Sequence, residues 1–379
     1  MKTNPLDQLK GICEQLLSRV ANLHKSFKHF FIETMICYLS ITGRVNFSQM
    51  ARFGKSCESR FRQNFKRKFD WVAFNTGLAS RTEGHLRAIA IDPCYIPKSG
   101  KKTPGLGYFW SGTANDTKRG LEILGMALVD ATDCLTLFLT AVQTFMGKRK
   151  GRTPDYLVHM DDPDSLIGLY LRAFASVADR LRGLTDLVVA DAYFAKRTFV
   201  IGLECLAFNL VSRFLDDVRL RYLYNGPRVK RRGQPKKFDG DVDIKNPRED
   251  VFKKTQVRKV YFSTDLTLSG EDIYWIYRLR FAIEFLYRDG KQFTGLTNCQ
   301  ARNSNSLDFA FNASLSAINI AKALSVESGL NLSVEDVKLL IHNTVMVQRI
   351  LSTFGKTPNL NLNQKNIKEL LFYGLKTAA

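Results

Sequence analysis

The sequence predicts a mixed α/β (α+β) protein in which a strand-rich centre lies between two helical regions. Over residues 8 to about 81, apolar residues recur at three-and-four spacing without strand-like alternation. From about Leu86, short apolar and aromatic runs are separated by Gly and Asp turn signals. Beyond Ser333 the helical spacing returns to the end of the chain. With 45% apolar residues in 379, the chain has enough material for a sizeable core.

The N-terminal region predicts a buried helix followed by a helix-turn-helix. The run FFIETMICYLSI is too short to span a bilayer and contains a glutamate. In VNFSQMARFGKSCESRFRQNFKRKF we expect a short helix, a break at Gly54 and a second helix capped by Ser56. Its aromatics would face the core and its cations a phosphate backbone; the alternative is a basic surface helix that enters no groove. The candidate DNA-binding cations are Arg60, Arg62, Lys66 and Arg67, with Lys68 beside them.

The centre of the chain predicts a sheet with one long interruption. The expected strands are HLRAIAIDPCYIP, GLGYFWSG, LEILGMALVDATDCLTLFLTAVQT, TDLVVADAY and FNLVSRF, with the helix SLIGLYLRAFASVADRLRGL before the last two. A basic stretch over residues 215–269 predicts a β-rich insertion flanked by RLRYLY and RKVYFSTDL. The helix LDFAFNASLSAINIAKALSV follows, and Ser333 with Asp336 predicts the cap of another helix.

The charge balance predicts a polyanionic partner. The chain has 56 Lys and Arg against 36 Asp and Glu, a formal charge of +20, which favours nucleic acid over an anionic membrane surface. The N-terminus has no apolar signal segment, so we expect a cytoplasmic protein. Its seven cysteines stand singly and its five histidines are dispersed. A zinc site or a disulfide framework is therefore not expected, and the cysteines are interpreted as reduced thiols.

The segment YRLRFAIEFLYRDGK, residues 277–291, predicts one helix with a polar stripe. At 3.6 residues per turn, the stripe fills an arc of roughly 80° and consists of Tyr277, Arg280, Glu284, Arg288 and Lys291. The opposite, apolar face consists of Trp275, Leu279, Ala282, Ile283 and Leu286. The stripe is either an ordinary solvated face, with Glu284 paired to arginines four residues away, or a functional surface.

Two aspartates lie in or just beyond strands whose other residues are apolar. Asp92 follows AIAI and Asp191 follows LVVA, and a buried carboxylate is costly without a partner. Each could be satisfied by a nearby Arg, Lys or backbone amide. Together with Glu284, however, three converging carboxylates have the oxygen ligands that a pair of divalent cations such as Mg²⁺ needs.

The sequence resembles the DDE transposases of bacterial insertion sequences, in the YREK-signature group (insertion sequence family four). Tyr277, Arg280, Glu284 and Lys291 match the signature at its spacing, and VADAYFAKRTF resembles the text around the second aspartate. The similarity covers residues 47–321, weakly at the start. It implies an RNase-H-like core. The order of the expected strands and helix also resembles that of such a core. The similarity also implies a metal-binding and catalytic triad of Asp92, Asp191 and Glu284 with two Mg²⁺ ions or Mn²⁺ as substitute.

The resemblance also implies partners and an organisation. Tyr277, Arg280 and Lys291 would hold the DNA beside the triad, with Arg288 less closely tied to the signature. The partners would be double-stranded DNA, as terminal inverted repeats and target, and a second copy of the chain on DNA, near the bacterial nucleoid. The expected segments are a helical DNA-binding region (1–85), the core (86–214 and 271–325), the insertion (215–270) and a helical C-terminal region (326–379).

Two features limit what the resemblance implies. The insertion lacks the tryptophan that often stacks on a displaced base in such transposases, so Phe252, Tyr261 or Phe262 would have to replace it. The segment SGKKT has the end of a phosphate-loop motif without its upstream glycine, so no nucleotide cofactor is expected. The leading hypothesis is cut-and-paste transposition. The alternatives are a metal-dependent nuclease without strand transfer and a non-catalytic DNA-binding regulator derived from a transposase.

Overall fold

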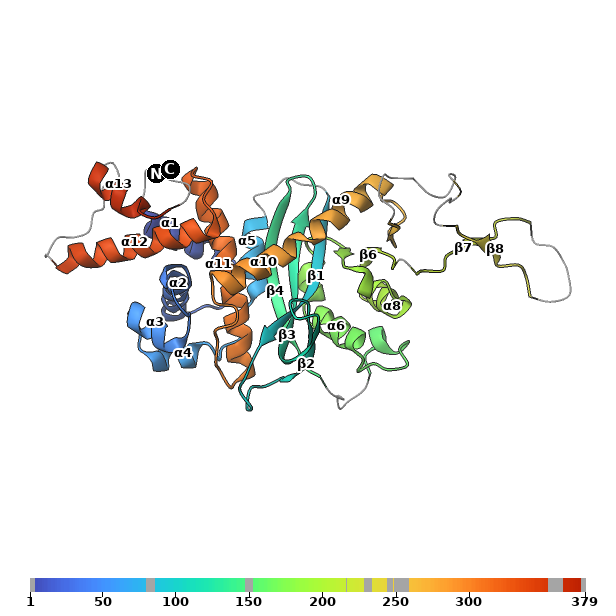
Figure 1. Cartoon of the computed structure of the whole chain (residues 1–379), viewed down its shortest axis with the longest axis horizontal. Helices are drawn as coiled ribbons and strands as arrows, with labels where there is room; N and C mark the ends of the chain where they lie inside the picture. Colours follow the sequence, from blue (N-terminus) through green and yellow to red (C-terminus); the bar gives the residue numbers. More distant parts are fainter. Residues whose placement is uncertain are drawn as a thin grey trace.

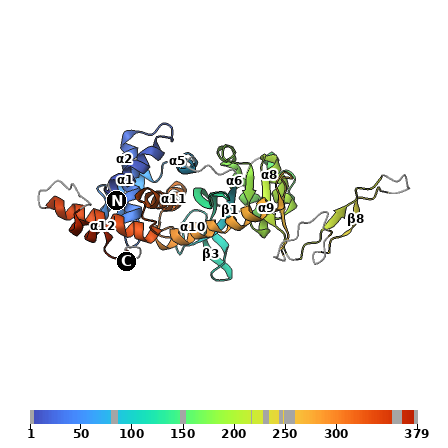
Figure 2. The ribbon, with the colours of Figure 1, turned by 90° about the horizontal axis from the view of Figure 1, so that it is seen from above.

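The fold is mixed α/β, as the sequence predicts, with helices at both ends of a curled sheet (Figure 1). The computed structural model describes residues 4–79, 86–146, 153–215, 217–227, 234–243, 248, 259–353 and 364–375. The helical part lies on one side of the sheet and the β7–β8 ribbon lies at the far end on the other side (Figures 1 and 2).

The main sheet is built around three parallel strands. The strands are β1 (Arg87–Pro97), β2 (Gly107–Ser111), β3 (Asp116–Asp130), β4 (Leu135–Thr144), β5 (Leu187–Val189), β6 (Asn209–Arg213) and β9 (Tyr261–Ser263). Their order is β2-β3-β1-β5-β6-β9, with β4 paired to β3. β1, β5 and β6 run parallel, whereas β3, β4 and β9 pair antiparallel with their neighbours. This mixed sheet is consistent with an RNase-H-like core.

The predicted insertion divides differently from expectation. RLRYLY forms β7 (Arg221–Leu223), which pairs only with β8 (Phe238–Asp241) among the described residues. RKVYFSTDL instead contains β9, which pairs with β6 and completes the edge of the main sheet. β9 pairs with Val211, Ser212 and Arg213 of β6. The backbone groups on this side of β6, which would otherwise form an open edge, are therefore paired.

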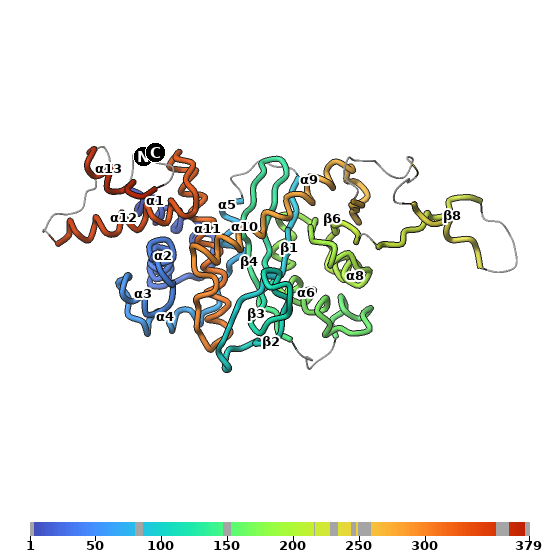
Figure 3. Tube along the Cα trace, viewed as in Figure 1, coloured from blue at the N-terminus to red at the C-terminus, as the bar shows by residue number. Residues whose placement is uncertain are grey.

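Helices cover both faces of the sheet. α6 (Leu166–Ala175) packs on β3 and β4, and α8 (Arg197–Cys205) packs on β6. α7 (Ala178–Leu181) is separate from α6, so the single helix expected over this stretch is interrupted at Ser176 and Val177. On the other face, α9 (Gly270–Arg280) and α10 (Ala282–Gln292) run across the strands to α11 (Ser304–Ser328), as Figure 3 shows.

The signature segment is two helices and not one. α9 ends at Arg280, α10 starts at Ala282, and Phe281 joins them with helical backbone angles. At the junction the N–H of Glu284 donates to the carbonyl of Phe281, a three-residue bond in place of the four-residue helical one. Trp275, predicted to be buried, is 46% exposed, whereas Ile276 beside it is buried.

The N-terminal region is helical over its described residues, as the spacing predicts. It consists of α1 (Pro5–Leu17), α2 (Lys25–Ser40), α3 (Phe47–Phe53), α4 (Glu58–Asn64) and α5 (Trp71–Ala79). FFIETMICYLSI lies in α2, and most of its side chains are buried. An aromatic cluster joins α2, α4, α5 and α11, in which the ring of Phe309 lies 4.5 Å from Phe65 and 5.0 Å from Trp71. Burial of these rings fixes the helical region on α11.

The helix-turn-helix pair differs from expectation at its cap. Gly54 ends α3 as predicted, but α4 begins after Cys57, and the predicted cap Ser56 bonds Glu33 of α2 instead. The backbone N–H and the hydroxyl of Ser56 both donate hydrogen bonds to the Glu33 carboxylate, at 2.7 and 2.6 Å. The serine therefore fixes the turn to α2, and α4 is shorter than predicted, ending before Lys66.

Two asparagines of α11 bind the open edge of β4. The side chain of Asn319 accepts from the N–H of Phe138 at 3.1 Å and donates to its carbonyl at 2.8 Å. Asn312 makes the same pair of bonds to Ala141, at 2.8 and 2.9 Å. Seven helical residues and three strand residues each span about 10 Å, so the two elements match in length. α11 is thus a buried cover for a strand edge.

α11 is also the single described helix with the length and composition of a membrane span. Its apolar window has a mean hydropathy of 1.2, and 89% of that window is buried inside the protein. The C-terminal part is helical where it is described, with α12 (Val334–Thr353) and α13 (Lys365–Phe372). Ser333 caps α12, and its hydroxyl donates to the Asp336 carboxylate at 2.8 Å, as predicted.

We expect Asn319→Ala to lower the free energy of unfolding by roughly 2–5 kcal/mol, because it leaves both backbone groups of Phe138 buried without a partner. Urea unfolding of the purified variant measures this. The control is Asn305→Ala on the same helix, an exposed amide bonded to the Lys66 carbonyl, for which we expect a loss below about 1 kcal/mol. Equal small losses in both variants would mean that α11 does not hold β4 in this way.

Candidate active site

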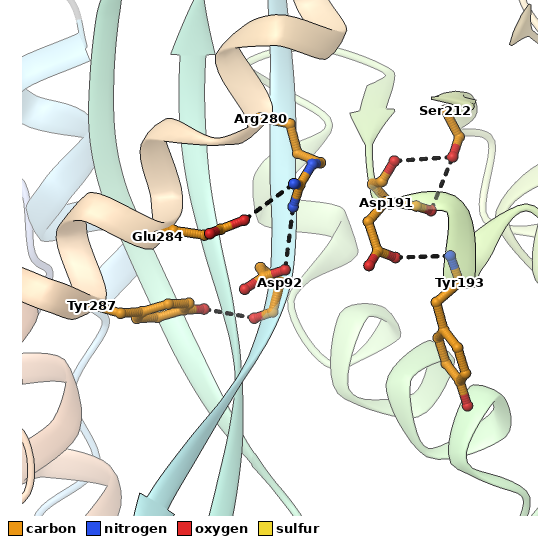
Figure 4. Close-up of polar contacts among 8 residues, drawn as sticks. Asp92, Asp191, Tyr193, Ser212, Arg280, Glu284 and Tyr287 are labelled. Atoms are coloured by element: carbon orange, nitrogen blue, oxygen red, sulfur yellow. Dashed lines mark hydrogen bonds and ion pairs between the residues drawn. The ribbon is translucent and has the colours of Figure 1, made fainter. Parts of the chain in front are cut away.

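Parallel pairing of β1 and β5 places two of the predicted carboxylates at neighbouring positions. Ala90 pairs with Val189, and two residues further along each strand stand Asp92 and Asp191. Because neighbouring strands are about 4.8 Å apart, the two aspartates lie side by side, Asp92 within β1 and Asp191 just after β5. Figure 4 shows the Asp191 carboxylate on the side of β5 that faces Asp92.

Arg280 joins the other two acidic positions. Its guanidinium lies 3.4 Å from the Asp92 carboxylate and 3.1 Å from the Glu284 carboxylate, so one cation bridges β1 and α10 (Figure 4). The Arg280 and Asp92 side chains are 13% and 17% exposed, whereas that of Glu284 is 40% exposed. The pair that the polar stripe predicted for Glu284 therefore forms with Arg280. It is part of a buried site and not of a solvated surface.

The electrostatics of the site centre on Asp92. Burial raises the pKa of Asp92 to about 8; Arg280 opposes this rise, and the charges of Glu284 and Asp191 add to it. Burial also opposes the charge of Arg280, but Asp92, Tyr277 and Glu284 outweigh it and raise the Arg280 pKa. Positive charge beside Asp92 therefore stabilises its ionised form, and the negative charges of Glu284 and Asp191 destabilise it.

Asp191 stands at the end of β5 and caps the following turn. Its carboxylate accepts the N–H of Tyr193 at 3.0 Å, and its backbone carbonyl accepts the Ser212 hydroxyl at 2.9 Å. The Ser212 hydroxyl also reaches the Ala190 carbonyl at 2.9 Å, so β6 fixes the backbone on which Asp191 stands. One oxygen of Asp191 is used by the turn, and the carboxylate remains partly exposed towards the site.

The three carboxylates fit a hard cation in their chemistry but not yet in their arrangement. Oxygen ligands from Asp and Glu suit Mg²⁺ or Mn²⁺, and a cation would offset the burial and the neighbouring negative charges that raise the Asp92 pKa. Over the described residues, no three His, Cys, Asp or Glu side chains gather closely enough to hold a metal ion. The Arg280 guanidinium occupies the space between Asp92 and Glu284.

Tyr287 and Gly125 hold Asp92 in place, and neither was predicted from the sequence. The Tyr287 hydroxyl donates to the Asp92 backbone carbonyl at 2.6 Å. Gly125 pairs with Asp92 across β1 and β3, and a Cβ there would lie 2.1 Å from the Tyr287 hydroxyl oxygen. The one available signal was that Tyr287 is three residues after Glu284 and so shares its side of the helix.

The other stripe residues divide into two groups. Tyr277 packs against Tyr261 of β9 at 4.9 Å, and Lys291 lies beside Cys94, two residues beyond Asp92, where its charge lowers the thiol pKa that burial raises. Arg288 points elsewhere: it pairs with Asp289 at 3.0 Å and lies over the Phe285 ring. The structure therefore brings Tyr277, Arg280, Glu284 and Lys291 onto the β1 side and leaves Arg288 outside.

The predicted DNA-binding cations of the N-terminal region are all exposed. Arg60 and Arg62 lie on α4, while Lys66 and Arg67 follow it, and Phe61 and Phe65 beneath them are buried, as predicted. Arg62 pairs with Glu58 and lies over the Phe47 ring, and Arg67 lies over the ring of Phe27. These contacts leave a basic surface whose binding role stays a prediction.

The proposed replacements for the missing tryptophan have different surroundings. Phe262 stacks on Phe214 at 4.2 Å, and Tyr261 packs against Tyr274 and Tyr277, so both are engaged in the β9 edge. Phe252 lies outside the described residues.

Comparison with known families finds one similarity, over less than half of the chain. The family model described as the transposase DDE domain matches residues 171–320. The match includes Asp191 and Glu284 and begins after Asp92. It supports a DDE transposase, while the YREK group within that class stays an expectation. No curated protein matches the chain.

Gly125→Ala should lower the free energy of unfolding by about 1–3 kcal/mol, because the new methyl group overlaps the Tyr287 hydroxyl. In a Tyr287→Phe background the closest atom is gone, so the same change should cost less. A double-mutant cycle in urea measures this coupling. Gly183→Ala is the control, at an exposed glycine where an added Cβ would lie 4.0 Å from the nearest atom, the Arg180 carbonyl oxygen. Fully additive losses would contradict the contact between Gly125 and Tyr287.

Proposed function

We propose that the protein is a cut-and-paste DNA transposase whose triad is Asp92, Asp191 and Glu284. A transposase-type function is supported by the domain match over residues 171–320. The observation that carries the residue assignment is the parallel β1–β5 register, which brings Asp92 next to Asp191 while α10 brings Glu284 to the same side. DDE transposases generally use divalent metal ions, and the donor set suits them.

The three carboxylates would hold two Mg²⁺ or Mn²⁺ ions after Arg280 turns away from Asp92. Bound there, the ions would supply an activated water and, later, an activated 3′-hydroxyl. In the first step the water oxygen bonds to phosphorus and the P–O3′ bond at the element end breaks, leaving a 3′-hydroxyl and a 5′-phosphate. In the second, the freed 3′-oxygen bonds to a target phosphorus and displaces the target 3′-oxygen.

The remaining residues of the site have roles that follow from where they lie. Tyr287 holds the backbone of Asp92, so the first carboxylate keeps its place when its cationic partner changes. Arg280, freed from Asp92, has a guanidinium suited to bidentate phosphate contact. Tyr277 and Lys291 flank it along the DNA path, and the exposed cations of the α3–α4 unit would bind duplex DNA further away. The second copy expected on DNA would bring the other element end.

Asp92→Asn, Asp191→Asn and Glu284→Gln should each abolish Mg²⁺-dependent cleavage of element-end DNA while duplex affinity changes less than about threefold. The reason is that each change removes a metal ligand, whereas affinity depends on many distributed phosphate contacts. Parallel gel-shift and cleavage assays measure the two effects. Asp179→Asn, at a carboxylate that is 93% exposed on α7, is the matched control and should cleave normally.

Three outcomes would overturn parts of the proposal. Cleavage that persists in all three variants would remove the triad. Cleavage without joined products on a supercoiled plasmid target would leave the metal-dependent nuclease in place of the transposase. Duplex binding with no cleavage in the wild-type protein under Mg²⁺ and Mn²⁺ would favour the DNA-binding regulator.

A further inference from the structure

A basic pocket lies at the far end of β1 from the acidic site. It is a cavity of about 630 Å³ formed by three segments that are distant in sequence, residues 44–46, 97–103 and 297–302. Its charged lining residues among those described are all cations: Arg44, Lys98, Lys101, Lys102 and Arg302. The segment SGKKT, which the ATPase motif did not explain, forms one wall. We call this cavity the SGKKT pocket.

The walls of the SGKKT pocket are fixed to one another by specific contacts. The Lys98 ammonium group donates to the backbone carbonyls of Thr297 and Cys299, which joins the first loop to the last. Gly295 has a left-handed φ of +72°, and a Cβ there would lie 3.0 Å from Cβ of Val45, so the glycine allows the N-terminal segment to pack closely. The pocket is therefore already formed before a ligand binds.

The cations that remain are exposed and have no acidic partner among the described residues. Lys98 is used for the structural bonds, and its pKa is lowered by burial. Arg44, Lys101, Lys102 and Arg302 are exposed and make none of the ion pairs found in the described part of the chain. Four like charges around a polar cavity repel one another, and an anionic ligand would offset that repulsion.

The direction of β1 relates the pocket to the site. Asp92, Cys94 and Ile96 lie on one face of β1, where Cys94 and Ile96 are buried. Lys98 directly follows Pro97, the last residue of the strand. Lys291 lies beside Cys94, between the acids and the pocket. Six residues of strand span about 20 Å, which is roughly six nucleotides at 3.4 Å per phosphate along one strand. The pocket also shares Asn46, Gln300 and Arg302 with a second cavity that Arg62 of α4 lines.

We propose that the SGKKT pocket binds the phosphodiester backbone of the element-end duplex, about six nucleotides from the strand end held at Asp92. The DNA would run over α10, which covers this face of β1, past the exposed Lys291 and reach the α3–α4 unit beyond the pocket. Lys101 and Lys102 provide point charges for phosphates, and Arg44 from the N-terminal region binds the same segment. This inference rests on the proposed function for the location of the strand end, but not for the binding of duplex DNA.

The first test measures the salt dependence of binding without metal, so that it does not depend on catalysis. A 30-base-pair duplex is titrated between 50 and 200 mM salt with wild type, Lys101→Ala/Lys102→Ala, and the control Lys365→Ala/Lys368→Ala. The control removes two exposed lysines from α13. With about 0.9 of slope for each phosphate contact, the log–log slope should fall by about 1.8 in the pocket variant only. An unchanged slope, or an equal fall in the control, overturns the proposal.

The second test locates the contact and the source of the phosphate. Neutral methylphosphonate links placed five to seven nucleotides from the pre-cleaved end should weaken wild-type binding and leave the pocket variant unaffected. An equal loss in both proteins would overturn the assigned position. Calorimetry with ATP distinguishes a free nucleotide: ATP binding by wild type that the variant loses, with equal DNA slopes, would overturn the proposal. If the wild-type protein does not cleave element-end DNA but the slope falls only in the pocket variant, the proposed function is rejected and the DNA contact at the pocket is kept.

Discussion

A carboxylate on the central strand of a covered sheet must have a positive partner, and Asp92 imposes this constraint on the surrounding structure. Arg280 meets it from the end of α9, and Glu284 shares the same guanidinium from the start of α10. Tyr287 then fixes the Asp92 backbone, for which Gly125 on β3 must lack a side chain. The crossing of α9 and α10 over the sheet is thus fixed by polar contacts at the point where chemistry is expected. Around that point the apolar core alone would allow the helices to shift.

The same constraint connects the structure to its proposed chemistry. Arg280 gives the acidic site one positive charge, and the proposed cations would replace it with more. An arginine released in this way would be free to contact DNA phosphate, so loading of the site and engagement of DNA would be coupled. The basic character of the chain, formally +20, has its counterpart in exposed cations after α3 and around the SGKKT pocket. Asp92 lies at the middle of β1, and this pocket lies just beyond its C-terminal end.

Local sequence patterns predicted much of the fold, and the site residues that they indicated stay a prediction. The β1 and β5 strands, the buried α2 helix and the cap at Ser333 each depend on neighbouring residues, and each is confirmed. The errors come from contacts that are distant in sequence. Ser56 bonds to Glu33, β9 pairs with β6 of the main sheet, and Ile276 is buried where Trp275 was expected to be. Likewise, no local pattern shows that Asn312 and Asn319 bind β4, or that Gly125 makes room for Tyr287.

The central claim is that Asp92, Asp191 and Glu284 together hold divalent cations when DNA is bound. Anomalous diffraction from crystals grown with Mn²⁺ and a pre-cleaved duplex measures this most directly, because it locates manganese independently of the protein density. We predict manganese between the three carboxylates, with oxygen ligands from each and with the Arg280 guanidinium moved from Asp92 onto a phosphate. Manganese bound elsewhere, or none at the site with Arg280 still between Asp92 and Glu284, would contradict the account.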